Sequence, residues 1–383
     1  MLRILFLSHS YPPIKGGVEN QNHNLATGLR KITGCKIIAN SKGKLHLLVF
    51  VPLTFVRACL LKDTYDACLV GNGVLAPLAA VLKLFFPQKG FFSVVHGLDV
   101  TFAGKKGLLA GIYRVVNIPS LKRLDRLFMV GNSTIMEAER MGIPGELCRF
   151  IPNGVNIAEF KRACPRDELS KLIGFDVSKK RVILRLSRFV PHKGTHWFIR
   201  NVMPKLPENI CLVAAGYRVT KHTVGDPDDF DDCSRAVLEN NLQKRVNLMT
   251  NLSQEAIRIL LNTVDMVVSP NVNYPGSLEG FGINAIEAAA CGRVVLASNL
   301  QGLADAVKDG RNGFLIEPEN VDHWIRTITD IFSKGDDFIA NFGKAAARFV
   351  EENYTWEKIT KQYMAEMERA VLLGRSHISG LHS

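Results

Sequence analysis

Short, continuously apolar runs recur along the whole chain and alternate with stretches of helical periodicity. The first run covers residues 3–8 and is followed by a loop rich in Gly and Pro, then by a helical pattern over roughly residues 18–31. Runs that are apolar at every position are typical of parallel strands buried on both faces, since half-buried strands alternate apolar and polar residues. The pattern therefore predicts an α/β protein with doubly wound parallel sheets. Further runs of this kind cover residues 36–39, 67–70, 91–95, 126–130 and 148–151.

The same architecture occurs twice along the chain. A second series of apolar runs begins at residues 181–187, after a polar, charged stretch around residues 161–180 that we interpret as a linker. We therefore predict two Rossmann-like domains, an N-terminal one over residues 1–172 and a C-terminal one over residues 173–352. The second series continues at residues 210–215, 246–249, 266–269, 294–297 and 313–316.

Residues 45–61 come nearest to a membrane-spanning segment. They fall short of about 18 uninterrupted apolar residues, because one His, one Pro and one Arg interrupt them, and lysines flank them on both sides. Two interpretations stay open, a helix packed on the sheet or a basic, apolar helix in a membrane interface. The run at residues 3–8 has no signal-peptide cleavage site, and we expect it to be a buried strand.

Composition fits a globular protein of two domains. The 383 residues are 47% hydrophobic and 22% charged, which excludes general disorder and suffices for two cores. The eight cysteines form no CxxC pair, which argues against a disulfide framework or a zinc site and fits a reducing cytoplasm. The net charge of +12 is unevenly spread, because residues 1–175 carry 23 basic and 11 acidic side chains, whereas residues 176–383 carry 25 of each.

A segment with two glutamates carries the most specific chemistry. Glu279 is followed by the turn Gly280-Phe281-Gly282 and by a small-residue helical pattern that contains Glu287. Glycine lets the backbone approach a ligand closely, and the helix start at Ile283 and Asn284 offers free N–H groups that suit a phosphate. Carboxylates beside such a phosphate can accept hydrogen bonds from sugar hydroxyls. The segment therefore predicts recognition of a sugar attached to a phosphate.

This segment resembles the E-x7-E signature of the family-four retaining glycosyltransferases of GT-B fold. Glu279 and Glu287 have seven residues between them and Ala-Ala-Ala-Cys-Gly after them, and other segments agree in order along essentially the whole chain. The resemblance implies two Rossmann-like domains facing a cleft, with a final helix within residues 353–383 that returns to the first domain. It also implies that Glu279 holds the hydroxyls of the donor sugar and Glu287 the ribose. The donor-binding residues that it implies between them are Gly280, Phe281, Gly282, Ile283 and Asn284.

Two loops at strand ends match the family's phosphate-binding segments. Gly16 and Gly17 follow the first strand, at the carboxyl edge where open α/β sheets bind ligands. The alternative that they only form a tight turn stays open. Arg188 and Lys193 lie five residues apart on a loop, and such a pair can clamp a diphosphate through charge-assisted hydrogen bonds. In the family the Gly-Gly loop lies over the donor, and the Arg and Lys neutralise the leaving nucleoside diphosphate.

Three residues of the first half are candidates for the acceptor side. His96 follows the run at residues 91–95, where it can hydrogen-bond a sugar hydroxyl, and Asp99 comes three residues later. Asn153 lies in a Pro-Asn-Gly-Val-Asn segment that resembles the family's P-N-G-V-D, with Asn156 in place of the usual acid. Structural roles stay open for all three: ending a strand for His96, capping a helix for Asp99 and forming a turn for Asn153.

Gly216 and the pair Asn251-Leu252 end two strands of the second half, where the family holds the nucleotide base. The family often has a second Gly after Ala-Gly and a Gly near position 250, whereas Tyr217 and Thr250 stand here. The base of the donor nucleotide therefore stays open, and the donor could carry UDP, GDP or ADP. The sugar, the acceptor and the oligomeric state stay open as well.

The resemblance implies a metal-independent retaining hexosyltransferase without a cofactor, because cations already occupy the phosphate site. A nucleotide-diphosphate sugar would be the donor, and a hydroxyl of a glycan or lipid-linked acceptor in cell-surface polysaccharide or glycolipid assembly would receive the sugar. Asp226-Pro-Asp228 matches the D-x-D of a different transferase fold, and we expect no metal there. A nucleotide-sugar epimerase on the same fold remains the first alternative. A nucleic-acid-binding protein is the second, although no stretch combines clustered cations with stacking aromatics.

The excess of positive charge in residues 1–175 points to a membrane. A general polyanion binder has no reason to confine its charge to one half, whereas an enzyme that meets a lipid-phosphate acceptor at an anionic membrane does. We therefore hypothesise a cytoplasmic protein that is peripheral on the inner face of the cell membrane. Its attachment would be centred on residues 42–62 and on Lys105 and Lys106.

Overall fold

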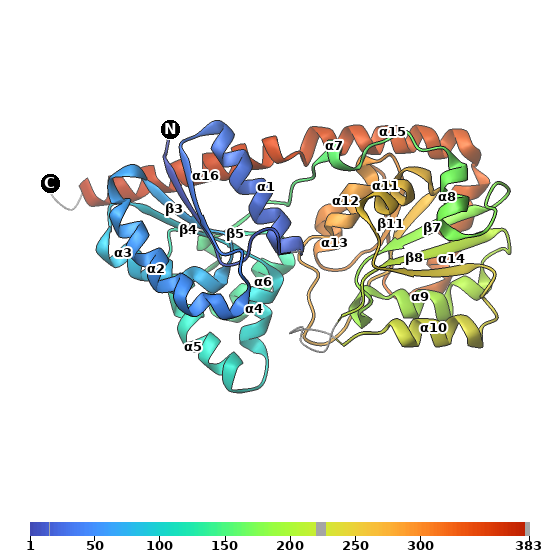
Figure 1. Cartoon of the computed structure of the whole chain (residues 1–383), viewed down its shortest axis with the longest axis horizontal. Coiled ribbons are helices and arrows are strands. Elements are labelled where there is room, and N and C mark those ends of the chain that lie inside the picture. Colours follow the sequence, from blue (N-terminus) through green and yellow to red (C-terminus); the bar gives the residue numbers. More distant parts are fainter. Residues whose placement is uncertain (15, 220–226, 380–383) are drawn as a thin grey trace. The chain divides into compact units, whose positions relative to one another are not determined.

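The computed structural model describes residues 1–14, 16–219 and 227–379, which divide into two compact units. Unit 1 consists of Met1–Gly154 and the C-terminal helix α16 (Trp356–Ser379), and unit 2 is Val155–Thr355. Each unit is built around one six-stranded parallel sheet with helices on both faces (Figure 1). The predicted α/β class with two doubly wound sheets is thereby confirmed.

The sheet of unit 1 has the strand order β2-β1-β3-β4-β5-β6, and every pair of neighbours is parallel. In its first strand Ile4 and Phe6 pack into the core on one face, and Leu5 and Leu7 into the core on the other, so the strand is apolar up to its last residue, Ser8. The strand order reverses at β1, and open α/β sheets bind ligands beside such a switch point, at the carboxyl ends of the strands. The strands are β1 (Ile4–Ser8), β2 (Cys35–Ala39), β3 (Ala67–Val70), β4 (Gly90–Val95), β5 (Arg126–Met129) and β6 (Cys148–Phe150).

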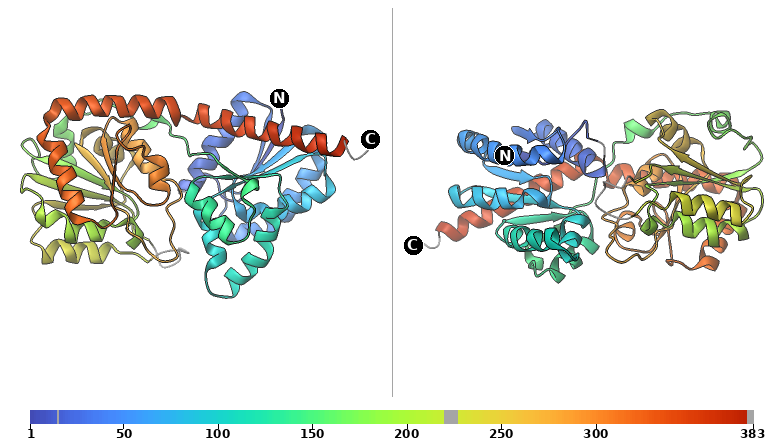
Figure 2. Two further views of the ribbon diagram at one scale, coloured as in Figure 1. Left: turned by 180° about the vertical axis from the view of Figure 1, so that it is seen from behind. Right: turned by 60° about the horizontal axis from the view of Figure 1, so that its bottom comes forward.

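Two layers of helices cover this sheet. Helices α1 (Gly17–Ile32) and α16 share the core cluster on one face, where Tyr363 of α16 meets Phe128 edge-on with 5.0 Å between ring centroids. Figure 2 shows α16 in red along the strands of unit 1, so the predicted return of the final helix to the first domain is confirmed. The opposite face is covered by α2 (Leu47–Leu60), α3 (Ala76–Phe85), α4 (Gly97–Gly104), α5 (Leu108–Lys122) and α6 (Asn132–Arg140).

The sheet of unit 2 has the strand order β12-β11-β10-β7-β8-β9, again all parallel. This order aligns the carboxyl ends of β10, β7, β8 and β9 in one row, although these strands are far apart in the sequence. Trp324 is fully buried on one face, edge-on to Phe198 at 5.6 Å between ring centroids. The strands are β7 (Arg181–Leu186), β8 (Ile210–Gly216), β9 (Val246–Thr250), β10 (Met266–Ser269), β11 (Val294–Ser298) and β12 (Phe314–Ile316).

The polar stretch at residues 161–180 contains α8 (Arg166–Ile173), a helix of unit 2. Its Leu169 is buried, and Arg166 binds Asp265 at 2.9 Å, so this stretch belongs to a folded unit. No helix in the described part of the chain has both the length and the apolarity that crossing a bilayer requires. The other helices of unit 2 are α7 (Ile157–Phe160), α9 (Thr195–Asn201), α10 (Phe230–Glu239), α11 (Gln254–Thr263), α12 (Ile283–Ala290), α13 (Gly302–Ala306), α14 (Val321–Ser333) and α15 (Gly335–Asn353).

Candidate functional site

The loops that follow β7 and β10 meet at the carboxyl edge of the unit 2 sheet. Lys193 ends the short turn Pro191–Lys193 after β7, and Glu279 lies in the loop after β10, the neighbour of β7 in the sheet. The ammonium of Lys193 forms an ion pair with Oε2 of Glu279, and only 15% and 13% of the two side chains are exposed. Two of the residues predicted from the sequence are therefore in direct contact, 86 positions apart along the chain.

Burial and charge act in opposite directions on the Glu279 carboxyl. Burial raises its pKa and is the largest single effect. The charge and hydrogen bond of Lys193, the charge of His192 and the hydrogen bond of Asn271 together outweigh burial and lower the pKa of Glu279 to about 2. The charges of Arg185 and Arg188 also act on Lys193, which places the predicted Arg188 in the same cluster. At neutral pH the Glu279 carboxylate is thus ionised beside these cations, and the charge of Asp229 also acts on Arg185.

Hydrogen bonds hold the ion pair from both sides. Asn271 donates to Oε2 of Glu279 at 2.8 Å, and the backbone N–H of Glu279 donates to Oε1 of Gln301 at 2.7 Å. The guanidinium of Arg185, buried within β7, donates to Oδ1 of Asn271 at 3.1 Å and to the carbonyl of Lys193 at 2.8 Å. Arg185, Asn271 and Gln301 are not among the residues predicted from the sequence. The sequence signal for Arg185 is a charged residue with apolar neighbours on both sides inside the run at residues 181–187.

The turn Gly280-Phe281-Gly282 connects the Glu279 loop to α12. Gly282 has a φ of +78°, in the left-handed region, and a Cβ there would meet the side chain of Leu303. Glycine is therefore required for this turn. Phe281 is buried and lies 5.9 Å from the ring of Tyr354, which anchors the turn in the core of unit 2.

The first two turns of α12 carry the remaining residues of this segment. Ile283 and Asn284 open the helix, where backbone N–H groups have no partner within the helix itself. The side-chain amide of Asn284 donates to the carbonyl of Leu186 and ties α12 to β7. Burial, together with the charge of Glu159, raises the pKa of Glu287 to about 7. The two predicted glutamates therefore differ, because Glu279 is ionised at neutral pH and Glu287 is near its titration midpoint.

Gly216, Asn251 and Leu252 lie at the ends of β8 and β9, the next strands in the row. A Cβ on Gly216 would overlap the backbone carbonyl of Ser187, so close packing of β7 and β8 requires this glycine. Asn251 is exposed with a left-handed φ of +56°, and Leu252 is half-buried. Their role in base binding stays a prediction.

In unit 1, His96 and Asp99 lie together at the start of α4. The buried carboxylate of Asp99 accepts from the N–H of His96 at 2.9 Å and from that of Gly73 at 3.1 Å, so it caps the helix, a role left open above. Nε2 of His96 lies 3.3 Å from the carbonyl oxygen of Gly71, and because a carbonyl only accepts, this nitrogen carries the proton. Burial lowers the pKa of His96, which keeps the imidazole neutral at neutral pH.

Gly16, Gly17 and Asn153 also lie at the carboxyl edge of the unit 1 sheet. Helix α1 begins at Gly17, and a Cβ on Gly16 would meet the carboxylate of Glu19, which accepts from the Ser10 hydroxyl at 2.5 Å. Asn153 follows β6 and is buried, and its Oδ1 has no hydrogen-bond partner among the described residues. A buried amide oxygen without a partner costs free energy, so Asn153 has capacity for a ligand contact.

Within residues 1–14, 16–219 and 227–379, no group of three or more His, Cys, Asp or Glu side chains is arranged to hold a metal ion. Asp226 of the Asp-Pro-Asp pattern lies outside the described residues. The second carboxylate of the pattern, Asp228, binds the guanidinium of Arg218 at 2.8 Å.

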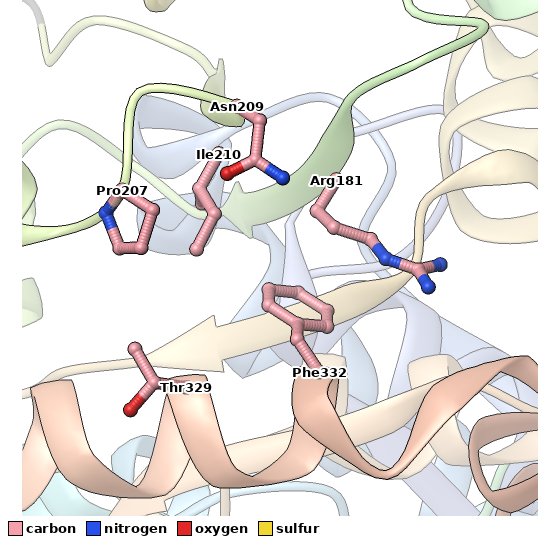
Figure 3. A pocket seen from close by; sticks show the side chains of 6 residues that line it. All are labelled: Arg181, Pro207, Asn209, Ile210, Thr329 and Phe332. Atoms are coloured by element: carbon pink, nitrogen blue, oxygen red, sulfur yellow. The ribbon is translucent and has the colours of Figure 1, made fainter.

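The hollow in Figure 3 is separate from this site. It encloses about 280 Å³ and is lined by Arg181, Pro207, Asn209, Ile210, Thr329 and Phe332. Arg181 and Ile210 begin β7 and β8, so the hollow lies at the amino edge of the sheet. Lys193 and Glu279 lie at the opposite, carboxyl edge.

The chain is similar to several known proteins. Residues 171–354 match the family model described as "Glycosyl transferases group 1". D-inositol 3-phosphate glycosyltransferase of Mycobacterium marinum is 28% identical over 218 residues, which are 57% of this chain and 44% of that protein. An uncharacterized glycosyltransferase of Methanocaldococcus jannaschii is 30% identical over 228 residues, 57% of this chain and 53% of that protein. The chain thus spans about half the length of the curated relatives it matches.

A solved structure resembles the chain over nearly its full length. Anabaena HepE in complex with UDP aligns with a TM-score of 0.74 and 20% identity, over 96% of this chain and 100% of that one. A likeness at this level of identity establishes the fold. The predicted fold, with two Rossmann-like units in one chain, is therefore shared with a known protein.

Proposed function

Because this chain belongs to the group 1 glycosyltransferases through residues 171–354, we propose that it is a retaining hexosyltransferase whose donor is a nucleotide-diphosphate sugar. The observation that carries the proposal is the buried ion pair of Lys193 and Glu279, next to the charge of Arg188. A departing diphosphate needs fixed positive charge, and a sugar needs acceptors for its hydroxyls. The ion pair offers both in one contact.

Each charged group of this cluster has a separate role in the proposed reaction. Lys193 and Arg188 bind the departing diphosphate together with the N–H groups that begin α12 at Ile283. Without ligand, Glu279 balances the charge of Lys193, and when the phosphates take over that charge its oxygens accept from the sugar hydroxyls. Removing either cation is expected to weaken transition-state stabilisation by roughly 3 kcal/mol, the scale of such electrostatic groups. Glu287 would hold the ribose.

We assign the base to the ends of β8 and β9 in unit 2. Gly216, Asn251 and Leu252 supply the backbone there, next in the row after the Lys193 loop. Uracil is the first base to test, in the form of a UDP-sugar, because HepE was solved in complex with UDP.

We assign the acceptor to unit 1, where His96 and Asn153 offer a neutral imidazole and an amide oxygen. The Gly16-Gly17 loop keeps its predicted role in binding the donor. The proposed acceptor is a hydroxyl of a glycan or of a lipid-phosphate-linked glycan in cell-surface polysaccharide or glycolipid assembly. The excess of basic residues in 1–175 supports a phosphorylated acceptor at the inner face of the cell membrane. The name of one relative, which specifies D-inositol 3-phosphate, agrees with a phosphorylated acceptor.

A thermal-shift panel of UDP, GDP and ADP sugars tests this proposal, since a ligand bound only by the native state raises its melting temperature. One of these donors is expected to shift the wild type, and to shift Lys193→Ala and Glu279→Ala much less. Lys179→Ala replaces an exposed lysine of the same unit and is the matched control. The anomeric configuration of the product formed with that donor then tests retention. Absence of a shift with all three donors, or isotope exchange at C2 of the donor without acceptor, would contradict the proposal.

A further inference from the structure

Helix α5 turns an apolar face to solvent. Its opposite face holds it in the core of unit 1 through Ile118 and Leu121. The exposed face consists of five large aliphatic side chains at the spacing i, i+1, i+4, i+7 and i+8, which places them on one stripe of a helix. They are Leu108, Leu109, Ile112, Val115 and Val116, each at least 45% exposed.

Helices α2 and α3 continue this apolar surface. Helix α2 buries Phe50, Thr54 and Ala58 and exposes its other face. Helix α3 contacts both α2 and α5, and its Phe85 lies 5.5 Å from the ring of Phe55 in α2. Because all three helices lie on the same face of the unit 1 sheet (Figure 1), their outer side chains form what we name the α2–α3–α5 surface. Besides the five of α5, we include Leu45, in the turn that leads into α2, and the exposed side chains Leu48, Val49, Leu53, Val56, Leu60, Val81, Leu84 and Phe85.

This surface sets unit 1 apart from unit 2. Of the 21 large hydrophobic side chains that are exposed in the described residues, 14 belong to the α2–α3–α5 surface, whereas unit 2 contributes Tyr217 and Leu238. Single exposed hydrophobic residues are normal on a water-soluble protein. A contiguous set on three neighbouring helices marks an interaction surface.

Most charges along this surface are basic. The exceptions are Asp63, which is exposed just after α2, and Asp125, which pairs with Lys83 of α3 at 2.7 Å. Arg57 and Lys62 are exposed at the end of α2, Lys106 precedes α5, and Lys122 and Arg123 end it. Residues 42–62 and 105–124 contain no Asp or Glu. The surface therefore combines aliphatic stripes with basic borders, the composition of helices that lie in a membrane interface.

We propose that the α2–α3–α5 surface docks the protein onto an anionic phospholipid bilayer. The aliphatic side chains enter the boundary between headgroups and acyl chains, and the bordering Lys and Arg side chains face the phosphates of the headgroups. The purpose of this docking, to bring a lipid-linked acceptor to unit 1, rests on the proposed function. The docking itself does not. Attachment by charge alone would leave the exposed aliphatic stripes unexplained.

Two other occupants fit this surface less well. A second copy of the chain in a two-fold contact would set the basic borders against one another. A protein partner is usually bound through Trp, Tyr and Arg anchors, whereas Phe85 is the sole aromatic side chain among the exposed residues named for the surface.

Vesicle flotation of the full chain tests the docking. The wild type is expected to float with vesicles of mixed phosphatidylcholine and phosphatidylglycerol. With vesicles of phosphatidylcholine alone it is expected to remain at the bottom of the gradient. The double variant Leu109→Gln/Val116→Gln should lose at least tenfold in affinity for the anionic vesicles, because it removes apolar area without changing charge. Leu238→Gln, at a position 61% exposed on α10 of unit 2, is the matched control and should float like the wild type. Ile112→Trp should shift its emission to the blue when anionic vesicles are added.

Two outcomes would overturn the docking. One is unchanged flotation of the Leu109→Gln/Val116→Gln variant. The other is a dimer in the absence of vesicles that this variant converts to monomer, which would assign the surface to a second copy. The thermal shift by a nucleotide-sugar, measured in the same variant, separates the two proposals. If the variant no longer floats but keeps its thermal shift with the nucleotide-sugar, the docking is supported. If the wild type floats but shows no thermal shift, the proposed function alone is contradicted.

Discussion

Replacing Lys193 by Met removes the cation of the buried ion pair and keeps an apolar side chain of similar length. The Glu279 carboxylate then stays buried without its partner. The environment lowers the pKa of Glu279 from its ordinary value of 4.5 to about 2. Each pKa unit corresponds to about 1.4 kcal/mol, so the ionised carboxylate contributes about 3 kcal/mol to the free energy of unfolding at neutral pH. Loss of one partner of a buried pair costs a similar roughly 3–5 kcal/mol.

The cost of Lys193→Met is expected to depend on pH in one direction. In the wild type, the depressed pKa of Glu279 stabilises the fold above pH 4.5, and this stability is lost only as the pH falls toward about 2. In the variant, the carboxyl loses the charge and the hydrogen bond of Lys193, which most strongly oppose burial, so its pKa rises toward that of Glu287, which burial raises to about 7. The difference in unfolding free energy should therefore be largest near about pH 8 and shrink between about pH 7 and 5, where the variant's carboxyl becomes protonated.

Urea denaturation followed by tryptophan fluorescence measures this difference. A Trp356→Phe background leaves Trp197 and Trp324 as reporters of unit 2, which matters because the two units need not unfold together. The double variant Lys193→Met/Glu279→Gln removes both charges and should regain most of the stability without regaining the proposed sugar transfer. A difference below about 1 kcal/mol near pH 8, the scale of an exposed ion pair, would refute the reasoning. So would a difference that stays constant down to about pH 5.

Glu287→Gln should stabilise unit 2 near about pH 8 and change little near about pH 4, because a carboxyl with its pKa raised to about 7 destabilises the fold as the pH rises above 4.5. Melting temperature against pH measures this effect, and a variant without pH dependence would contradict it. Gly216→Ala should cost unit 2 roughly 1–3 kcal/mol in urea through overlap with the Ser187 carbonyl, whereas Gly111→Ala on the open side of α5 should add up to about 1 kcal/mol. Asp99→Ala should cost unit 1 about 1–2 kcal/mol in urea, because two backbone N–H groups lose their acceptor, and an unchanged midpoint would speak against the cap.

The strands and the charged residues of the site follow from local sequence, but the hydrogen-bond network behind them does not. Strands of a buried parallel sheet are apolar at most positions, as β1 shows when Ile4 to Leu7 send successive side chains into two cores. Lys193 and Glu279 stand out by residue type and by their place after strands. Arg185 and Asn271 meet because β10 lies next to β7 in the sheet, and strand order is not encoded in the pattern of either strand.

Residues 45–61 show why an apolar pattern leaves two interpretations open. Nearly every position in the segment is apolar, so the periodicity that marks a buried helix face is weak there. The structure confirms a helix packed on the sheet, since Phe50, Thr54 and Ala58 are buried. The membrane interpretation now applies to the opposite face of α2 and stays a prediction.

The path of the chain through the two units also determines the order in which they can fold during synthesis. Helix α16 follows unit 2 along the chain, yet it covers the face of the unit 1 sheet that contains Ile4 and Phe6. Unit 2 is continuous, and its ends meet, since the N–H of Val155 donates to the carbonyl of Tyr354 at 2.7 Å. Domains generally fold as units while they leave the ribosome. Unit 2 can therefore be completely folded while one face of the unit 1 sheet is still exposed to water. The half that is translated first is thus the half that finishes folding last, and it depends on chaperones or on its own solubility until α16 arrives.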